Sequence, residues 1–410
     1  MASVFLYHVV GDLTVGKPVL VEFYDNEPVE SALRAIADTT EGGIPVWKRK
    51  QTLKGVNLIE GSEVRLQRFV GILNSLDIVS FLAKAECLED QEKAMRTPVA
   101  EVLTPNSSLL KEVDPGTRLI DALEMMKQGV RRLLVPKSVG WRGMSKRFSI
   151  LYHGKWLKNI ETSSSPTTGN RSSSSSAPRD SRFCCLSRED VLRFIIGCLG
   201  ALAPIPLSSI SNLGAINTHF CFVDASAPAI YATRKPPQDP CAIAVVEPTP
   251  DGQQKIIGEI SASKMWKCNY LGAAWALANL SAGQFVMGSE DQGNPTFPDF
   301  SINAQLEDME KTTVGSRPWK FSSRSVGFFS NPASSMAAGA GARYRGRSAP
   351  LTCKVTSSLA AVMAQMLSHR AAHVWVTEEE AEDVLVGVVS YTDILFAVTK
   401  NPSTVISTIP

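Results

Sequence analysis

A chain of 410 residues with 44% hydrophobic residues is long enough for two or three domains and can fill their cores. Its 42 basic and 40 acidic residues give a formal net charge of +2, which excludes a global electrostatic drive toward nucleic acid or an anionic membrane surface. The first residues lack a basic start and reach Asp12 before a long apolar segment develops, so no secretory signal is expected.

Two further observations indicate a cytoplasmic protein, with nuclear presence left open. The most apolar segment, VLRFIIGCLGALAPIPL at 191–207, contains Arg193 and two prolines, so it predicts a buried helix and its exit rather than a membrane span. The eight cysteines form no Cys-x-x-Cys pair, which favours reduced thiols and no metal site.

The first predicted elements in chain order are a helix and two strands. Val29, Ala32, Leu33 and Ile36 form the apolar stripe of a short amphipathic helix. The apolar run GIPVW at 43–47 predicts a strand, and GILNSLDIVSFL from Gly71 predicts a second strand that turns into a second helix.

The same order of helix, strand, strand and helix recurs three times. The third copy has only a remnant of its first helix, which prolines 236 and 237 end. The repeated segments are the helical stripes Leu119, Ala122, Leu123, Met126 and Leu359, Val362, Met363, Met366, the first strands RRLLVP (131–136), AIAVV (242–246) and HVWV (373–376), and the exits CCLSREDVLRFI (from 184), GEISASKMWKCN (from 258) and GVVSYTDILF (from 387).

These copies predict an α+β fold of four repeats with two long low-complexity insertions. We place the repeats at 15–84, 105–200, 206–280 and 350–401. The Ser-rich insertion at 137–182 lies inside repeat 2, and 283–349 is expected to be a disordered basic linker, because neither can bury enough apolar surface to order itself.

Two positions match across the repeats at the exit of the second predicted strand. A small polar residue comes first, and a carboxylate follows three residues later except in repeat 3, where a lysine replaces it. The pairs are Asn74 with Asp77, Ser187 with Asp190, Ser261 with Lys264, and Ser390 with Asp393.

This unit, with Gly-apolar-apolar-Ser/Thr-x-x-Asp at its corner, resembles the CBS domain, named for cystathionine beta-synthase. The resemblance covers most of the chain outside the two insertions. The overall plan looks like a plant protein with four CBS repeats, similar in layout to the gamma subunit of the AMP-activated and sucrose non-fermenting kinase family. It implies one module from repeats 1 and 2 and another from repeats 3 and 4. It also implies an adenosine ligand, AMP, ADP, ATP or S-adenosylmethionine, with no cofactor required.

The corner suits a nucleotide. A carboxylate accepts both ribose hydroxyls, a hydroxyl donates to a phosphate, and the amides at the helix start favour an anion. Sites are therefore expected at Asp77, Asp190 and Asp393, with Ser187 and Ser390, and those of Asp190 and Asp393 are the best candidates. The alternative for each corner is a capping box, which uses the same residues only to begin a helix.

A phosphate also needs cations, and the resemblance implies a His-Arg pair at the start of the first predicted strand. Arg131 and Arg132 occupy those positions in repeat 2, and His373 occupies the second in repeat 4. Gly43 and Ala242 stand there in repeats 1 and 3. The alternatives are a solvated corner for the arginines and a strand-edge histidine for His373.

The chain shows no Walker loop, His-Glu-x-x-His motif or kinase signature, so we expect a non-enzymatic regulatory protein. The resemblance to gamma subunits implies protein kinase subunits as partners. A ligand-free CBS scaffold for protein interactions and an enzyme of unrecognised type remain as alternatives.

A last candidate site lies in the basic linker. In RGRSAP, Arg345 precedes Ser348 by three residues and Pro350 follows by two. This spacing suits a basophilic kinase and resembles the phosphoserine peptide that 14-3-3 proteins bind. The alternative is a solvated linker with no partner.

Overall fold

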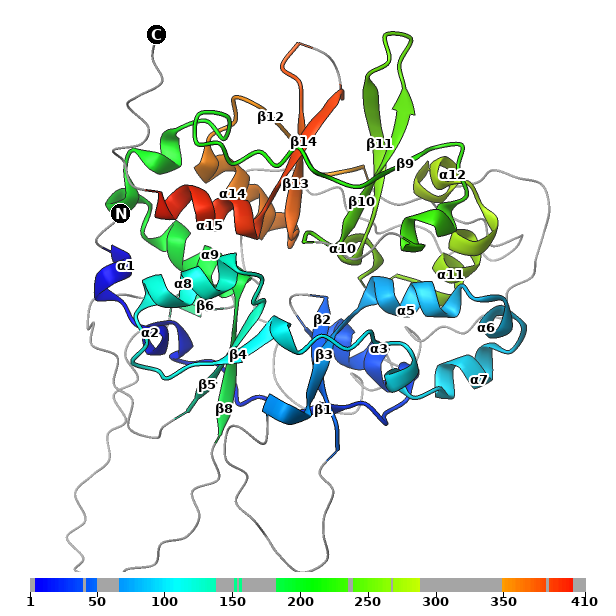
Figure 1. Cartoon of the computed structure of the whole chain (residues 1–410), viewed down its shortest axis with the longest axis horizontal. Helices are drawn as coiled ribbons and strands as arrows, with labels where there is room; N and C mark the ends of the chain where they lie inside the picture. The colour runs from blue at the N-terminus through cyan, green and yellow to red at the C-terminus, as the bar shows by residue number, and fades with distance from the viewer. Residues whose placement is uncertain are drawn as a thin grey trace, which may run out of the picture. The chain divides into compact units, whose positions relative to one another are not determined.

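The computed structural model describes residues 4–39, 42–49, 66–137, 151–152, 155–156, 182–234, 239–266, 268–287, 349–380 and 383–400 (Figure 1). The predicted phosphosite Ser348 and most of both insertions lie outside these residues.

Each repeat contains one sheet of three strands. A short first strand lies parallel to the second, and the second pairs antiparallel with the third. The strands are β1 (Phe23–Tyr24), β2 (Gly43–Trp47) and β3 (Phe69–Asn74) in repeat 1, β4 (Leu110–Glu112), β5 (Arg132–Pro136) and β8 (Phe183–Ser187) in repeat 2, β9 (Phe222–Asp224), β10 (Ala242–Pro248) and β11 (Gln254–Ser261) in repeat 3, and β12 (Thr352–Lys354), β13 (His373–Thr377) and β14 (Leu385–Ser390) in repeat 4.

The helices before the second strands bury the stripes that the sequence predicts. They are α3 (Val29–Asp38), α8 (Leu119–Lys127) and α14 (Leu359–His369). In repeat 3 the remnant is the 3-10 helix η5 (Ala229–Arg234), which confirms the shortened element. The helices after the third strands are α5 (Ser75–Leu82), α9 (Arg188–Gly197), α10 (Ala262–Met265) and α15 (Tyr391–Thr399).

Further elements are additional to the predicted helix-strand-strand-helix order of each repeat. They are α1 (Val4–Tyr7), α2 (Val10–Thr14), α6 (Ala85–Glu89), α7 (Gln91–Arg96), α11 (Tyr270–Asn279), α12 (Ala282–Met287), the 3-10 helices η1 (Val99–Glu101), η2 (Ser107–Leu109), η3 (Leu199–Leu202) and η4 (Ile205–Leu207), and the two-stranded pair β6 (Leu151–Tyr152) and β7 (Lys155–Trp156).

One predicted boundary is wrong. The sequence predicts a disordered linker from residue 283, but α12 runs to Met287 and buries Phe285 and Val286 against repeat 3. This end of the predicted linker is helical because the apolar side chains of Phe285 and Val286 pack into the core of repeat 3.

The sheets pack in pairs, as the CBS resemblance implies. Trp47 and Phe69 of repeat 1 share a buried cluster with Leu110, Leu134 and Phe183 of repeat 2. In the second pair, strand residues of repeat 3 such as Val246 and Ile256 pack with Trp375 and Val388 of repeat 4. The fold is thus α+β with two tandem modules.

The two modules meet through their helices. In repeats 1 and 3, α5 packs against α10 and α11, and in repeats 2 and 4, α8 packs against α15 and α9 against α14 (Figure 1). One buried cluster of the described residues combines these helices of repeats 2 and 4 with α1 and α2. The corners at which the third strands turn into helices therefore face the junction of the modules.

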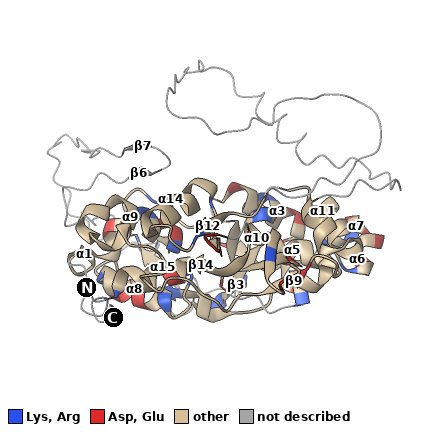
Figure 2. Ribbon diagram, turned by 90° about the horizontal axis from the view of Figure 1, so that it is seen from above, with Lys and Arg blue, Asp and Glu red and all other residues tan. Residues whose placement is uncertain are grey.

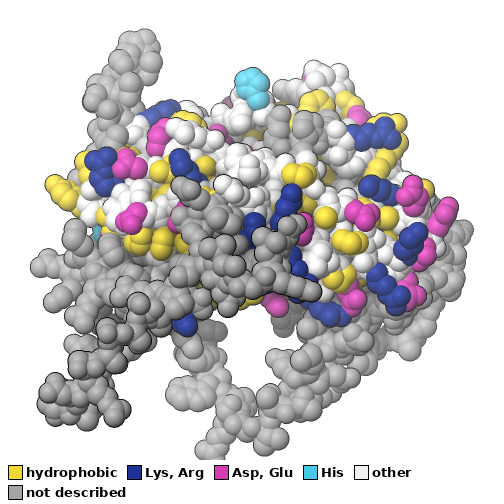
Figure 3. Space-filling view, turned by 60° about the horizontal axis from the view of Figure 1, so that its bottom comes forward, with side chains coloured by type: hydrophobic (Ala, Val, Ile, Leu, Met, Phe, Trp, Pro, Cys, Tyr) yellow, Lys and Arg dark blue, Asp and Glu magenta, His cyan; other side chains and the backbone are white. Residues whose placement is uncertain are grey.

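Neither a separate charged surface patch nor a disulfide is seen among the described residues. Acidic and basic residues are interspersed along the elements in Figure 2 and on the face shown in Figure 3. All eight cysteines lie in described segments, and none of them forms a disulfide. Among the described residues, no helix has both the length and the apolar character needed to cross a bilayer.

Candidate functional site

The strand register confirms the alignment of the four corners. The first residue of each second strand pairs with the polar residue that ends the third strand of the same repeat. The pairs are Gly43 with Asn74, Arg132 with Ser187, Ala242 with Ser261, and His373 with Ser390. The residue types at these paired positions therefore decide what each corner can bind.

Three of the corners are complete capping boxes. The backbone N–H of Ser187 donates to Asp190 at 2.8 Å, that of Ser390 donates to Asp393 at 2.8 Å, and that of Asn74 donates to Asp77 at 3.0 Å. The side chains of the N-terminal residues accept from the helix backbone in return. Each carboxylate thus has a structural role, and any ligand contact comes in addition to it.

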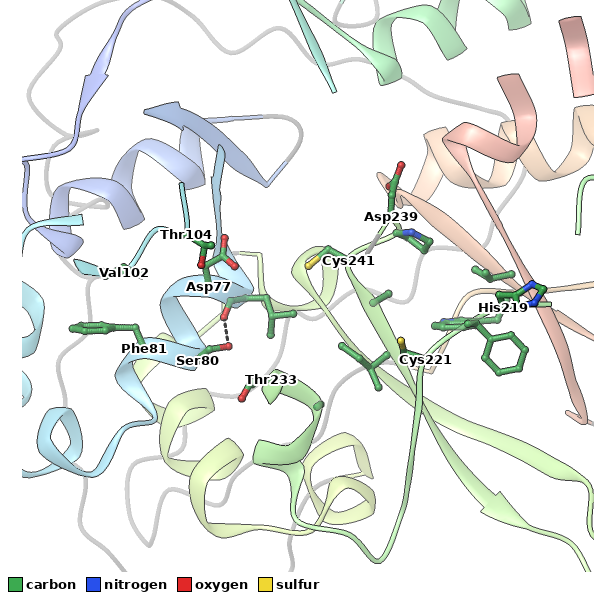
Figure 4. A pocket seen from close by; sticks show the side chains of 18 of the residues that line it. Asp77, Ser80, Phe81, Val102, Thr104, His219, Cys221, Thr233, Asp239 and Cys241 are labelled. Atoms are coloured by element: carbon green, nitrogen blue, oxygen red, sulfur yellow. Dashed lines mark hydrogen bonds between the residues drawn. The ribbon is translucent and has the colours of Figure 1, made fainter. Parts of the chain in front are cut away.

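Asp77 lines a cavity of about 310 Å³ (Figure 4). The figure shows Asp77 beside Thr104, with Asp239 and Cys241 on the neighbouring wall. Burial raises the pKa of Asp77 to about 6, although the hydrogen bond from Asn74 and the charge of Arg131 act in the opposite direction. The carboxyl group is therefore ionised at pH 7 but close to its titration range.

The walls of this cavity come from both modules. Repeat 1 contributes one face of α5, and the segment that follows η1 adds Val102 and Thr104. The opposite wall belongs to repeats 3 and 4. Its residues include His219, Phe220, Cys221, Thr233, Asp239, Cys241, Ile243 and Trp375.

A second cavity of about 150 Å³ adjoins the first, since Asp239 and Cys241 line both. All four repeats contribute to its lining, which is rich in basic side chains. The basic residues are Arg131, Arg132, Arg188, Arg370, His369 and His373, and the acidic ones are Glu189 and Asp239. This basic cavity can hold a multiply charged anion.

Asp239 is neutralised by its neighbours at the boundary of the two cavities. Arg188 forms an ion pair with its carboxylate, and the Thr392 hydroxyl donates to it at 2.9 Å. Burial acts to raise the pKa of Asp239, but the charge and hydrogen bond of Arg188 outweigh it and hold the pKa below its ordinary value. Arg188, Asp239 and Arg370 line the basic cavity but are not among the site residues predicted from the sequence. The position of Arg188 directly after a corner serine was the available signal.

The other two corner carboxylates, Asp190 and Asp393, have different surroundings from Asp77. Asp190 forms an ion pair with Lys17 from the N-terminal segment. Asp393 accepts from the backbone and hydroxyl of Ser390, and burial raises its pKa. Neither residue contributes to the lining of the two cavities described above. The corners of repeats 2 and 4 thus contribute Arg188, Glu189 and Tyr391 to the basic cavity but not their carboxylates, Asp190 and Asp393.

The predicted basic residues do converge. Arg131, Arg132 and His373 all line the basic cavity, although they come from different modules. Arg132 also donates to the carbonyl oxygen of Gly43 at 3.3 Å, across the sheet pair. One ring nitrogen of His373, Nε2, is engaged with Glu259 at 3.1 Å.

Comparison with known proteins agrees with this architecture. The CBS domain family model matches residues 346–400, which cover repeat 4. The Arabidopsis thaliana protein described as CBS domain-containing protein CBSX6 is 66% identical over 98% of this chain and 96% of its own length. This chain belongs to the plant CBS domain-containing proteins.

More distant relatives of this CBS domain protein match along nearly the whole chain. CBS domain-containing protein CBSX5 of Arabidopsis thaliana is 26% identical, covering 96% of this chain and 97% of the relative. The SNF1-related protein kinase regulatory subunit gamma-like PV42b of the same plant is 23% identical, covering 95% and 94%. Among solved structures, protein MJ1225 from Methanocaldococcus jannaschii matches with a TM-score of 0.48 at 12% identity, covering 94% of this chain and 98% of that one.

Proposed function

We propose that this protein is a non-enzymatic regulatory subunit that binds an adenosine nucleotide at the junction of its two CBS modules. The observation that carries the proposal is the contact between two cavities of different chemistry. One contains the Asp77 carboxylate and apolar walls, and the other contains four arginines. A nucleotide has the same division between its nucleoside and its phosphates.

The Asp77 cavity suits the nucleoside. The carboxylate of Asp77, ionised at neutral pH, accepts hydrogen bonds from two ribose hydroxyls. Val102 and Ile243 offer apolar surface for the base, while Ser80 and Thr104 supply hydroxyls at its edge. A volume of about 310 Å³ lies at the lower end of the range for small-molecule sites.

The basic cavity suits the phosphates. Four arginines face two carboxylates there, so the lining keeps an excess of positive charge. Arg131, which lines the basic cavity, also acts through its charge to lower the pKa of Asp77, so the two cavities are electrostatically linked. Arginine binds phosphate oxygens through two parallel hydrogen bonds, which makes it well suited to this end.

A ligand in this place would contact both modules and so bias how they dock, since binding shifts a protein toward the arrangement that binds better. We propose that a partner protein binds one arrangement of the two modules better than the other and so responds to the ligand. The printed name of the relative PV42b, a gamma-like regulatory subunit of an SNF1-related protein kinase, favours protein kinase subunits as that partner.

The test is a titration of the purified chain with ATP, ADP, AMP and S-adenosylmethionine, followed by thermal unfolding. At a ligand concentration of ~100 times Kd, linkage adds about 2.7 kcal/mol to the free energy of unfolding for one site. Asp77→Ala should abolish this gain, and the matched control Asp251→Ala, in an exposed hairpin turn, should keep it. A wild-type chain that responds to none of the four ligands would refute the proposal.

A ligand-free scaffold is the second candidate, and one observation favours it. Three corner carboxylates are engaged in helix capping, and lysines occupy the corners of repeats 2 and 3. In that case kinase subunits should co-purify from plant extract to the same extent with and without nucleotide.

A further inference from the structure

The third strands of three repeats are each crossed by the chain segment that leads into the partner repeat of the same module. The backbone N–H of Asn106 donates to Val70 in β3 at 2.8 Å, and that of Leu20 donates to Phe183 in β8 at 2.7 Å. In repeat 4, Asn217 pairs with Val388 of β14 in both directions at 2.9 Å. Val70 and Phe183 are equivalent, because each lies four residues before its corner residue.

Because Val70 and Phe183 are equivalent, the residue that corresponds to Lys17 in the segment crossing β3 can be identified as Leu103. Lys17 precedes Leu20 by three residues, as Leu103 precedes Asn106. Leu103 lies over Gly71 of β3, and Ile216 lies over the matching Gly387 of β14. Two of the crossing segments therefore place an aliphatic residue beside the corner, whereas the segment over repeat 2 places a lysine there.

The lysine reaches the corner carboxylate. The Lys17 ammonium group pairs with Oδ2 of Asp190, the same atom that accepts from the backbone N–H and the hydroxyl of Ser187, each at 2.8 Å. The two side chains are only 12% and 18% exposed. The ammonium group of Lys137 donates a hydrogen bond to the carbonyl oxygen of Lys17 and so fixes the backbone of the crossing segment.

Repeat 1 shows the same corner without a lysine. Val102 and Thr104, the neighbours of Leu103, line the cavity into which Asp77 opens. At Asp190 the corresponding carboxylate is covered by the chain itself. The crossing segment thus contributes Leu103 at the corner of repeat 1 and Lys17 at the corner of repeat 2.

We propose that Lys17 is a built-in occupant of the repeat 2 corner, and that Asp190 is a latent second site for the ribose of an adenosine nucleotide. The ammonium group takes the place of the ribose hydroxyls as donor to the carboxylate. The site opens when Lys17 withdraws. This inference rests on the proposed function, because it assumes the same ligand class at both corners.

The experiment compares Lys17→Met with the wild-type chain by isothermal titration with ATP and AMP. Methionine keeps the length of the side chain and removes its charge. We expect the stoichiometry to rise from one to two per chain, and Asp190→Asn added to Lys17→Met to return it to one. The matched control is Lys111→Met on the exposed edge of β4, which should leave the stoichiometry unchanged.

A second measurement does not depend on nucleotide. Hydrogen exchange of residues 9–20 should increase in Lys17→Met and in Asp190→Asn, and the double variant should exchange no faster than either single one. Unchanged exchange in both single variants would overturn the closed corner. If the wild-type chain binds one nucleotide and Lys17→Met still binds one, the latent site is wrong while the proposed function stands. If neither chain binds, the proposed function fails, and the latent site with it.

Discussion

His373 Nε2 lies 3.1 Å from a carboxylate oxygen of Glu259, and this contact joins β13 of repeat 4 to β11 of repeat 3. Both residues are almost completely buried, at 2% and 3% exposure. The Trp375 indole N–H donates to the same oxygen, and the Ser261 hydroxyl donates to the other at 2.8 Å. A carboxylate with three donors is a defined link between the two sheets of the module rather than a surface ion pair.

Breaking this link should destabilise the second module. His373→Ala leaves a buried carboxylate without one of its hydrogen-bonding partners, a change that typically costs about 1–3 kcal/mol. Chemical denaturation at pH 7 measures the loss. Replacing the exposed His369 by Ala is the control and should cost far less. Equal effects of the two replacements would contradict a structural role for the pair.

The same link predicts acid sensitivity. Burial acts to raise the pKa of Glu259, but His373 and the hydrogen bonds outweigh it and lower the pKa to about 2. A depressed pKa means that the stabilisation is complete above pH ~4.5 and is lost as the pH falls toward 2. Glu259→Gln should flatten this part of the stability curve, whereas Glu247→Gln, exposed on β10, should not.

Asp77→Asn should stabilise the ligand-free protein while removing its response to nucleotide. The raised pKa of about 6 means that ionising Asp77 works against folding as the pH rises from 3.8 to 6. At pH 7.5 the accumulated cost is roughly 3 kcal/mol, from about 1.4 kcal/mol per pKa unit. Thermal unfolding with and without ATP measures both effects. A variant that is less stable than wild type would contradict the burial argument.

Gly258→Ala should loosen α12 from its sheet. A Cβ atom at Gly258 would lie 2.5 Å from the Cβ of Val286, closer than two carbons can approach. Such overpacking typically costs about 1–3 kcal/mol. Hydrogen exchange of residues 282–287 should rise. The control is Gly200→Ala, where a Cβ meets no atom within 4 Å, and it should leave that exchange unchanged.

Phosphorylation of Ser348 should create a 14-3-3 binding segment. The phosphate adds about −1.5 to −2 charges, which an arginine cluster on the partner pairs with. Peptides spanning 340–355, with and without phosphate, should be titrated against a 14-3-3 protein. Equal binding of the two peptides, or none, would refute the prediction.

The corners were predictable because their signal is local. Ser390 and Asp393 stand three residues apart at a strand exit, and both the strand and the helix are long enough to show their periodicity. The short strands β1, β4, β9 and β12, which open the four sheets, are not predicted from the sequence because they are too short to show a periodic pattern. With only two residues in β1 and three in β4, β9 and β12, no alternation can be seen.

The sequence does not predict which side chains contact each corner, because these partners lie far away along the chain. Lys17 and Asp190 are separated by 173 residues, and nothing in the N-terminal segment marks Lys17 as a buried cation. Glu259 has the polar place of an alternating strand, yet the sheet of repeat 4 covers it. Packing between the repeats, rather than local propensity, therefore decides how each corner carboxylate is covered.

The crossing segments also govern how this chain can be divided. Residues 17–20, at the start of repeat 1, cover β8 of repeat 2, and residues 103–106, where repeat 2 begins, cover β3 of repeat 1. A fragment that contains a single repeat would thus lack the segment that covers its own third strand, and it would retain the segment that covers the third strand of the neighbouring repeat. The smallest piece of this chain that keeps its strands covered is consequently a module with its leading segment, so gain or loss of a single repeat would be costly in its evolution.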